Sequence, residues 1–325
     1  MQVKDLISAR VSLAPMAGIT DYVLRSLIRE QSPSALLTTE MISSEALTQV
    51  KDTVITKRDE NHSPISYQLS GHKPQMIAKC AQYLENFADM IDINMGCPVN
   101  KVVKGTDGCA LMRNHQLAAE IVRTVKASVS IPVSVKFRLG YTFDEMNYVD
   151  FGERMQEAGA DFITIHARTR SQMYGGKADW KKIAELKHSV DIPVFANGDV
   201  VSVESAIQCL EESEADGVAV GRASLGDVTL IHRIEEYLNK GIYLPPPSLE
   251  EKIDTLKKHL IKECELRRED VGVKFCRKFY PYYLNGFHGA SKLRGEIVLI
   301  EKLDDVFKKL DKILLENSLS DKFVL

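Results

Sequence analysis

Asp92-Ile93-Asn94-Met95-Gly96-Cys97-Pro98 is the stretch around which the rest of this chain can be interpreted. The apolar run over residues 90–93 predicts a short buried strand, and the Gly and Pro that follow end it abruptly. Cys97 therefore lies on a loop directly after a strand end. Strand ends in α/β folds are where chemistry is usually placed, although an intracellular cysteine is more often a buried, inert residue. The rest of the chain decides between these two interpretations.

Length and composition indicate a large folded chain without an extreme charge. The 325 residues are 44% hydrophobic, enough for one large domain and a smaller one, and the formal net charge is −3. A nucleic-acid partner would therefore need a local basic patch. The 6 cysteines contain no C-x-x-C pair, which disfavours a disulfide framework or a metal site and predicts a reducing cytoplasm. With no signal-like start and no apolar run near the ~20 residues of a membrane span, we expect a cytoplasmic protein.

Short strand-like runs alternate with longer helix-like patterns through most of the chain. Strands are expected at 12–14, 35–39, 65–68, 90–94, 133–136, 162–166, 194–196 and 217–220, and helices at 75–86, 116–127, 150–158, 180–188 and 202–212. Because many of these strands are apolar on both faces, the alternation predicts a parallel sheet closed into a (β/α)8 TIM barrel. An open doubly wound sheet is the alternative, but it usually opens with a glycine-rich nucleotide turn that this chain lacks.

The pattern changes after Tyr237. Prolines at 245–247 predict a stiff linker, and Ser248 followed by Glu251 has the spacing of a capping box that opens a helix. The remaining sequence is helical in pattern. We therefore expect two domains, a barrel over 1–243 and a smaller C-terminal helical domain over 244–325.

The expected strand ends carry polar and small side chains that would meet at the active-site face of a TIM barrel. Loops after strands seven and eight often bind phosphate, and Gly198, Gly221 and Arg222 suit that role. A single lysine or histidine at a strand end is often only structural, so it is the convergence of several such residues that favours a site. In chain order they are Pro15, Met16, Ala17, Gln68, Asn94, Cys97, Lys136, Arg138, His166, Arg168, Arg170, Asn197, Gly198, Asp199, Gly221 and Arg222.

These residues lie in an ordered set of motifs that resembles the tRNA-dihydrouridine synthase family, nearest its bacterial B-type branch. The set spans the expected barrel in the family's order, and 275–278 and 282–283 resemble the family's helical domain. The matching stretches are 13–21 (LAPMAGITD), 40–41 (EM), 68–71 (QLSG), 92–98 (DINMGCP), 101–104 (KVVK), 135–140 (VKFRLG), 165–170 (IHARTR), 178–180 (ADW), 197–199 (NGD) and 221–223 (GRA).

The resemblance implies an FMN enzyme that reduces specific uridines in tRNA, with NADPH or NADH as the reductant. The chain has no separate dinucleotide fingerprint, so the nicotinamide is expected to visit the same open face as the substrate. Cys97 would be the proton donor. By the same resemblance Pro15, Met16 and Ala17 would back the flavin ring, Gln68, Lys136 and His166 would contact it, and Asn197, Gly198, Asp199, Gly221 and Arg222 would hold the ribityl chain and phosphate.

The chemistry of uracil reduction accounts for these residue types. A hydride at C6 is supplied by reduced flavin, and a proton at C5 must come from a positioned acid. A thiol, with an ordinary pKa of about 8.5, stays mostly protonated at neutral pH. Asn94 is expected to hydrogen-bond the base, and Arg138, Arg168 or Arg170 to stabilise developing charge or to bind phosphate.

The segment 271–294 predicts a surface that grips RNA. Because the target base must leave the folded RNA to reach a flavin, the enzyme needs contacts to the backbone and to unstacked bases. The segment has no acidic residue and interleaves aromatic side chains, some of which must belong to the core, with its basic ones. The basic residues are Lys274, Arg277, Lys278, Lys292 and Arg294.

Two stretches depart from the family pattern. Thr106 and Asp107 stand where small residues are usual, and 226–229 replaces a Gly-x-Pro-Trp turn. We expect these changes to affect loop movement or the choice of RNA position. Cys109, a second thiol in the same loop, is expected to be structural.

Three alternatives remain open from the sequence. The first is an FMN-dependent reductase or dehydrogenase of a free pyrimidine, as in dihydroorotate dehydrogenases, which would not need the basic aromatic segment. The second is the same chemistry on another RNA. The third is a non-catalytic tRNA-binding module, against which Cys97 and Lys136 argue.

Overall fold

The computed structural model describes residues 2–49, 57 and 62–322, so residues 1, 50–56, 58–61 and 323–325 of the two expected domains lie outside it. Parallel strands close into a barrel: β1 pairs with β2 and β9, β2 pairs with β4, and the ladder continues from β4 through β9. The predicted (β/α)8 barrel is confirmed. The barrel strands are β1 (Val11–Leu13), β2 (Leu36–Thr38), β4 (Ile65–Ser70), β5 (Met90–Asn94), β6 (Val133–Arg138), β7 (Phe162–His166), β8 (Val194–Asn197) and β9 (Gly217–Val220).

One further strand, β3 (Ile42–Ser43), was not predicted. It pairs in parallel with the end of β4, which runs to Ser70 rather than ending at Gln68. A two-residue strand carries no hydrophobic period, so only its pairing with β4 reveals it.

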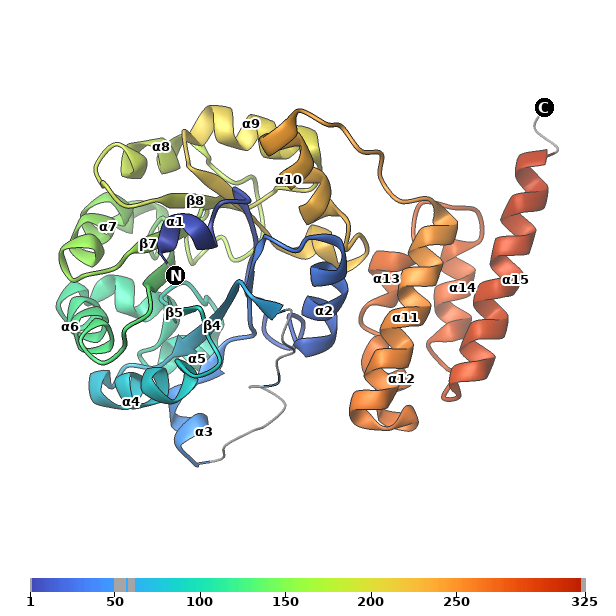
Figure 1. Ribbon diagram of the computed structural model, residues 1–325, viewed down its shortest axis with the longest axis horizontal. Helices are drawn as coiled ribbons and strands as arrows, with labels where there is room; N and C mark the ends of the chain where they lie inside the picture. Colours follow the sequence, from blue (N-terminus) through green and yellow to red (C-terminus); the bar gives the residue numbers. More distant parts are fainter. Residues whose placement is uncertain (1, 50–56, 58–61, 323–325) are drawn as a thin grey trace.

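Helices surround the barrel (Figure 1). In α6, buried residues recur at Ala118, Ile121, Val122 and Val125, the spacing of one helix face turned to the strands. The other helices of the ring present apolar faces in the same way. They are α2 (Tyr22–Gln31), α3 (Ser44–Gln49), α4 (Pro74–Leu84), α6 (His115–Lys126), α7 (Tyr148–Glu157), α8 (Lys181–Lys187), α9 (Val203–Ser213) and α10 (Leu230–Lys240).

A short N-terminal helix, α1 (Val3–Leu6), closes the end of the barrel where the strands begin (Figure 1). Leu6 packs in a separate apolar cluster with Met90, Phe162 and Phe195, which lie at the starts of β5, β7 and β8. Because this end is filled by packing, the opposite end, where the strands finish, is the one available for a ligand.

The chain after the proline linker forms α11 (Leu249–Arg267), α12 (Glu269–Cys276), α13 (Tyr280–Tyr283), α14 (Ala290–Ile297) and α15 (Leu303–Lys322), to one side of the barrel in Figure 1. The predicted capping box is present: Ser248 Oγ accepts from Glu251 N at 3.2 Å, and Ser248 N donates to the Glu251 carboxylate at 2.7 Å. A single apolar cluster runs from the barrel into these helices, so the division into two domains stays a prediction. None of the helices in the described ranges has the length and apolar character needed to cross a bilayer.

Candidate active site

A cavity of about 420 Å³ opens at the carboxyl ends of the barrel strands. It brings together every residue that the sequence assigned to a flavin, and Asn94, Cys97, Arg138 and Arg168 line it as well. Arg170, Lys274, Arg277 and Lys278 are not among the lining residues. The strand register explains the convergence, since Lys136 lies opposite Asn94 and Asn197 lies opposite His166 in neighbouring strands.

Lys136 brings a cation to the floor of the cavity. Its Nζ donates to Asn197 Oδ1 at 3.0 Å, and Asn197 Nδ2 is held in turn by the carbonyl of Ala219 at 2.8 Å. Burial, together with the nearby charge of Arg138, lowers the pKa of Lys136 to about 8. A negative charge arriving in the cavity would therefore be stabilised by this ammonium group.

His166 is a neutral hydrogen-bonding group at neutral pH. Burial, with Arg138 and Lys136 adding to it, lowers the pKa of His166 well below its ordinary value. Next to it, Gly198 has φ +119°, and a Cβ there would lie 3.0 Å from the His166 ring and 3.1 Å from Ala178. Only glycine fits this position, and it brings backbone rather than a side chain to the cavity.

Arg168 and Asp199 form an ion pair in the cavity lining in which Arg168 is buried and Asp199 is partly exposed. The Arg168 guanidinium is 2% exposed and reaches both Asp199 oxygens, at 2.8 and 2.7 Å. It also donates to the carbonyls of Gly175 and Gly176, at 3.0 and 2.7 Å. From the sequence, Arg168 was expected to contact the substrate and Asp199 to hold FMN. In the structure the two side chains bind each other, and their contacts connect the loop after β7 to the end of β8.

The loop that carries Cys97 is held by backbone hydrogen bonds. Asn94 Oδ1 accepts from Cys97 N at 2.9 Å and from Gly96 N at 3.2 Å, while the carbonyl of Cys97 accepts from Cys109 N at 3.1 Å. Gly108 has φ +58°, and a Cβ there would lie 2.7 Å from the Cys97 oxygen, so this close approach requires glycine.

The Cys97 thiol is half-buried, and burial raises its pKa although Arg138 and Lys136 oppose the shift. The group is therefore protonated at neutral pH, which suits a proton donor. Cys109 is fully buried, and its pKa is raised to about 12, as expected of a structural thiol.

Two tyrosines that the sequence did not place in the cavity also line it. The ring of Tyr174, in the loop after β7, lies 5.6 Å from the guanidinium group of Arg138 and 5.3 Å from that of Arg222. Tyr282 comes from α13, so the C-terminal helices reach the cavity directly. A Cβ on Gly226 would lie 2.0 Å from the Tyr282 carbonyl oxygen, so only glycine allows this close contact. Gly226 begins the turn at 226–229, which differs from the family pattern, and the turn therefore packs against α13. Neither tyrosine follows a strand directly, so no strand-end signal marks them.

Three of the basic residues expected to grip RNA, Lys274, Arg277 and Lys278, have partners within the chain. Lys274 pairs with Glu301 at 3.0 Å, and Arg277 donates to the Ile300 carbonyl at 3.2 Å. Lys278 donates to the Gly18 carbonyl and lies over the Phe275 ring. Glu301 lies beyond the segment that looked free of acids, so its pairing was not visible in the sequence. RNA contact by these residues stays a prediction.

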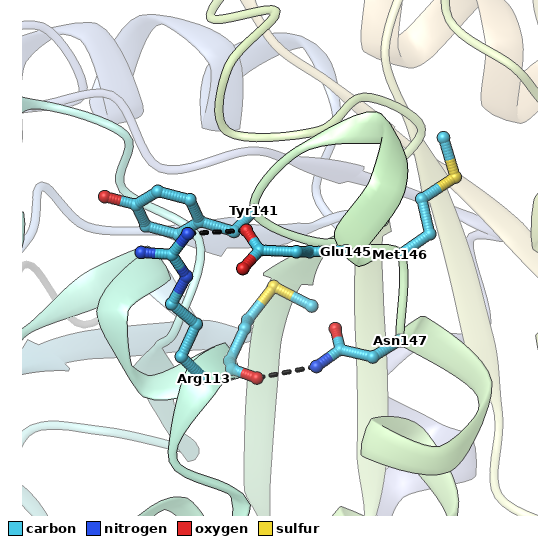
Figure 2. A pocket seen from close by; sticks show the side chains of 6 residues that line it. Arg113, Tyr141, Glu145, Met146 and Asn147 are labelled. Atoms are coloured by element: carbon cyan, nitrogen blue, oxygen red, sulfur yellow. Dashed lines mark hydrogen bonds and ion pairs between the residues drawn. The ribbon is translucent and has the colours of Figure 1, made fainter.

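A second hollow, of about 610 Å³, is lined by Met112, Arg113, Tyr141, Glu145, Met146 and Asn147 (Figure 2). Arg113 lies over the Tyr141 ring at 3.4 Å and is paired with Glu145, while Asn147 Nδ2 donates to the Met112 carbonyl at 2.7 Å. Arg170 lies 5.1 Å from the same ring and binds Asn100, at the start of α5 (Asn100–Lys104), the helix that follows Cys97. The charge of Arg113 is compensated within the hollow.

Comparison with known proteins gives a consistent result. The dihydrouridine synthase (Dus) family model matches residues 12–319. The chain is 40% identical to probable tRNA-dihydrouridine synthase 1 of Synechocystis over 94% of this chain and 86% of the relative. It is 36% identical to the probable tRNA-dihydrouridine synthase of Rickettsia bellii (95% and 94%) and to tRNA-dihydrouridine synthase B of Pseudomonas aeruginosa (91% and 90%). The resemblance found in the motifs is confirmed, and the chain belongs to the dihydrouridine synthase family of oxidoreductases.

Proposed function

We propose that this protein reduces the C5–C6 double bond of D-loop uridines in tRNA in the cytoplasm, using bound FMN, NADPH or NADH, and Cys97 as the proton donor. The observation that carries the proposal is a protonated thiol on a tethered loop in the same cavity as Lys136 and Arg222. The printed names of the relatives supply the substrate class.

The cavity residues fit FMN, which combines a flat ring with an anionic phosphate. Asp199 is the single carboxylate among the described lining residues, and Arg168 already binds it. Lys136 and Arg222 are therefore available to an anion, with Arg222 near the phosphate and Lys136 near the ring. Reduced FMN, when bound, supplies the hydride for C6 of the uracil.

Side chains of the protein would deliver the proton and stabilise the negative charge that its transfer leaves behind. Cys97 Sγ–H gives its proton to C5 of the base, and the thiolate left behind is stabilised by the positive charges of Lys136 and Arg138. Arg138 Nε donates to the Gly96 carbonyl at 2.9 Å, so it also fixes the loop on which the thiol is carried. His166 stays neutral and offers a hydrogen bond without adding charge.

Recognition of tRNA would involve the C-terminal helices. Tyr282 lies 38% exposed on α13 and borders the cavity, a position suited to stacking on a base that has left the RNA helix. Lys274, Arg277, Lys278 and Arg170 are then candidates for backbone contacts, once RNA phosphates compete with their present partners.

The first experiment is dihydrouridine mapping on tRNA from cells that lack the gene. We expect dihydrouridine to be lost at one or a few D-loop positions, and to be restored by the wild type but not by Cys97→Ala. In vitro, Cys97→Ala should slow dihydrouridine formation by about 10²- to 10⁴-fold while leaving reduction of FMN by NADPH intact. Cys264→Ala, a half-buried thiol on α11, is the matched control and should keep full turnover.

An unchanged tRNA profile would contradict the proposal. Assays of the purified enzyme with a free pyrimidine and with other cellular RNA would then separate the remaining substrates. If a Cys97→Ala variant still makes dihydrouridine at the wild-type rate, the proposed reaction stands, but Cys97 is not its proton donor.

A further inference from the structure

A chain of hydrogen bonds links the Cys97 loop to a carboxylate inside the barrel. Gly96 N and Cys97 N donate to Asn94 Oδ1, and Asn94 Nδ2 donates to Gln68 Oε1 at 2.7 Å. Gln68 Nε2 then donates to Asp92 Oδ2 at 2.6 Å, and Ser134 Oγ donates to Asp92 Oδ1 at 2.6 Å. Gln68, Asn94 and Asp92 are all buried.

The strand register creates this chain. Gln68 in β4 lies opposite Asp92 in β5, and Asp92 lies opposite Ser134 in β6. Asn94 follows Asp92 by two residues and so points to the same face of the strand. Asp92 is not among the residues that line the active-site cavity, whereas Gln68, Asn94 and Cys97 are.

Elementary hydrogen-bond chemistry fixes the direction of every link. A backbone N–H can only donate, so Asn94 must turn its oxygen to Gly96 and Cys97 and its NH₂ group to Gln68. Gln68 must then present its oxygen to Asn94 and its NH₂ group to the next partner. That partner has to be an acceptor, and Asp92 is the group that accepts.

We propose that Asp92 is a positioning residue: as the terminal acceptor, it fixes the Gln68 and Asn94 amides and through them the backbone that holds Cys97. This inference rests on the proposed function in giving Cys97 the role of proton donor. Asp92 is not among the cavity-lining residues, so it acts on the Cys97 backbone through Gln68 and Asn94, while its negative charge also opposes the lowering of the Lys136 pKa. Removing the acceptor would leave a buried Gln68 N–H unpaired and loosen the whole chain.

Reversing the polarity of the chain provides the test. In Asn94→Asp, a carboxylate lies on each side of Gln68, which can offer its NH₂ group to only one of them. The double variant combines Asn94→Asp with Asp92→Asn. Its new carboxylate at position 94 accepts from the backbone and from Gln68, and its new amide at position 92 donates to the Gln68 oxygen while accepting from Ser134. Every donor again meets an acceptor, with the net charge of the wild type.

Amide hydrogen exchange of residues 95–99, measured by mass spectrometry on FMN-free protein, gives the readout. We expect Asn94→Asp to accelerate exchange at least tenfold and the double variant to return within threefold of the wild type. Asp92→Asn alone should also stay within threefold, because an amide at position 92 can accept from Gln68 while donating to Ser134. Asp92→Leu, which has no acceptor, should resemble Asn94→Asp. Exchange in α6 provides the control that each variant is folded.

Equal exchange rates in Asn94→Asp and in the double variant would overturn the role of Asp92, whether both are fast or both are slow. So would wild-type protection in Asp92→Leu. The measurement needs neither cofactor nor RNA, so a failure to find dihydrouridine in the tRNA experiment would leave this result standing as a separate finding.

Discussion

The cavity and the contact between barrel and C-terminal helices both bury charged groups, but they balance the charge in different ways. The second region, the helix seam, consists of Asp21, Glu40, Glu263, Arg267 and Lys278. There Arg267 binds Asp21 at 2.8 Å and Glu263 at 2.9 Å, so the cation and both carboxyls come from the chain itself. In the cavity, by contrast, the single carboxylate among the described lining residues is Asp199, and it is already bound to Arg168. Lys136 and Arg222 therefore find no other carboxylate in that lining.

The difference separates a region whose charges pair with each other from a cavity whose lining has more positive than negative side chains. Burial raises the pKa of Asp21 to about 6, with Glu263 adding to the effect, whereas burial lowers the pKa of Lys136 to about 8. The seam therefore contributes to holding the helices on the barrel, and the proposed function assigns the cavity cations to an anionic ligand. Lys278 connects the regions, since it donates to the Gly18 carbonyl in the loop after Ala17.

The largest expected effect is at the seam. Arg267→Met removes the cation shared by Asp21 and Glu263 and should lower the free energy of unfolding by about 3–5 kcal/mol, the usual cost of breaking a buried ion pair. Chemical denaturation at pH 7 measures it. The neighbouring Arg268 is 80% exposed and pairs with Asp270 on the surface, so Arg268→Gln should change stability by less than about 0.5 kcal/mol. Equal losses in the two variants would show that the seam is not stabilised by its own charges.

The pH dependence of the seam is the next largest effect. Because the pKa of Asp21 is raised from 3.8 to about 6, the folded state holds an extra proton between these values. This group therefore stabilises the fold fully below pH 3.8, and that stabilisation is lost as pH rises through 6. Asp21→Asn keeps the cap of α2 but cannot titrate. Its stability relative to the wild type should rise by up to about 3 kcal/mol between about pH 4 and pH 6.5. A difference that does not change with pH would contradict this account.

At alkaline pH, the stability contributed by the cavity should change with pH in the opposite direction. The pKa of Lys136 is lowered from 10.5 to about 8, so the unfolded chain binds the extra proton between these values, and stability rises with pH across that range. Lys136→Met should remove about 2 kcal/mol of this rise, less than the full shift implies because Lys136 is half-buried and borders the open cavity. Thermal unfolding at pH 8, 9 and 10 measures it. Saturating FMN should flatten the wild-type rise, and a rise that persists unchanged with FMN would mean that Lys136 does not meet the ligand's negative charge.

The sequence predicted the elements whose signal is local. Apolar runs located the barrel strands, and the polar residues at their ends were found together in the cavity because parallel strands end at the same face. What it missed depends on which strands become neighbours. The Asp92–Gln68 link and the Arg168–Asp199 pair join residues 24 and 31 positions apart, and no local pattern encodes such a partnership. Glu301 was missed for the same reason, since it meets Lys274 only after α14 folds back.

The smallest expected effect is at Thr106, where the sequence departs from the family pattern beside the Cys97 loop. Thr106 is exposed, with φ +66°, and a β-branched residue is strained in this left-handed region. Thr106→Gly should relieve that strain and stabilise the protein by about 0.5–1 kcal/mol after the entropy of glycine in the unfolded chain is included.

The matched control is Thr124→Gly, at a half-buried position in the last turn of α6, where glycine loses the threonine hydrogen bond to the Glu120 carbonyl and should cost about 0.5 kcal/mol. Thermal unfolding should therefore shift the two variants in opposite directions. If both lose stability, the turn after α5 tolerates threonine without strain. The departure would then have to be explained by the contact that Asp107 makes with His72 at 2.7 Å, which ties the turn after Cys97 to the end of β4. If only Thr124→Gly loses stability, the backbone strain lies at Thr106, in the turn that follows the Cys97 loop.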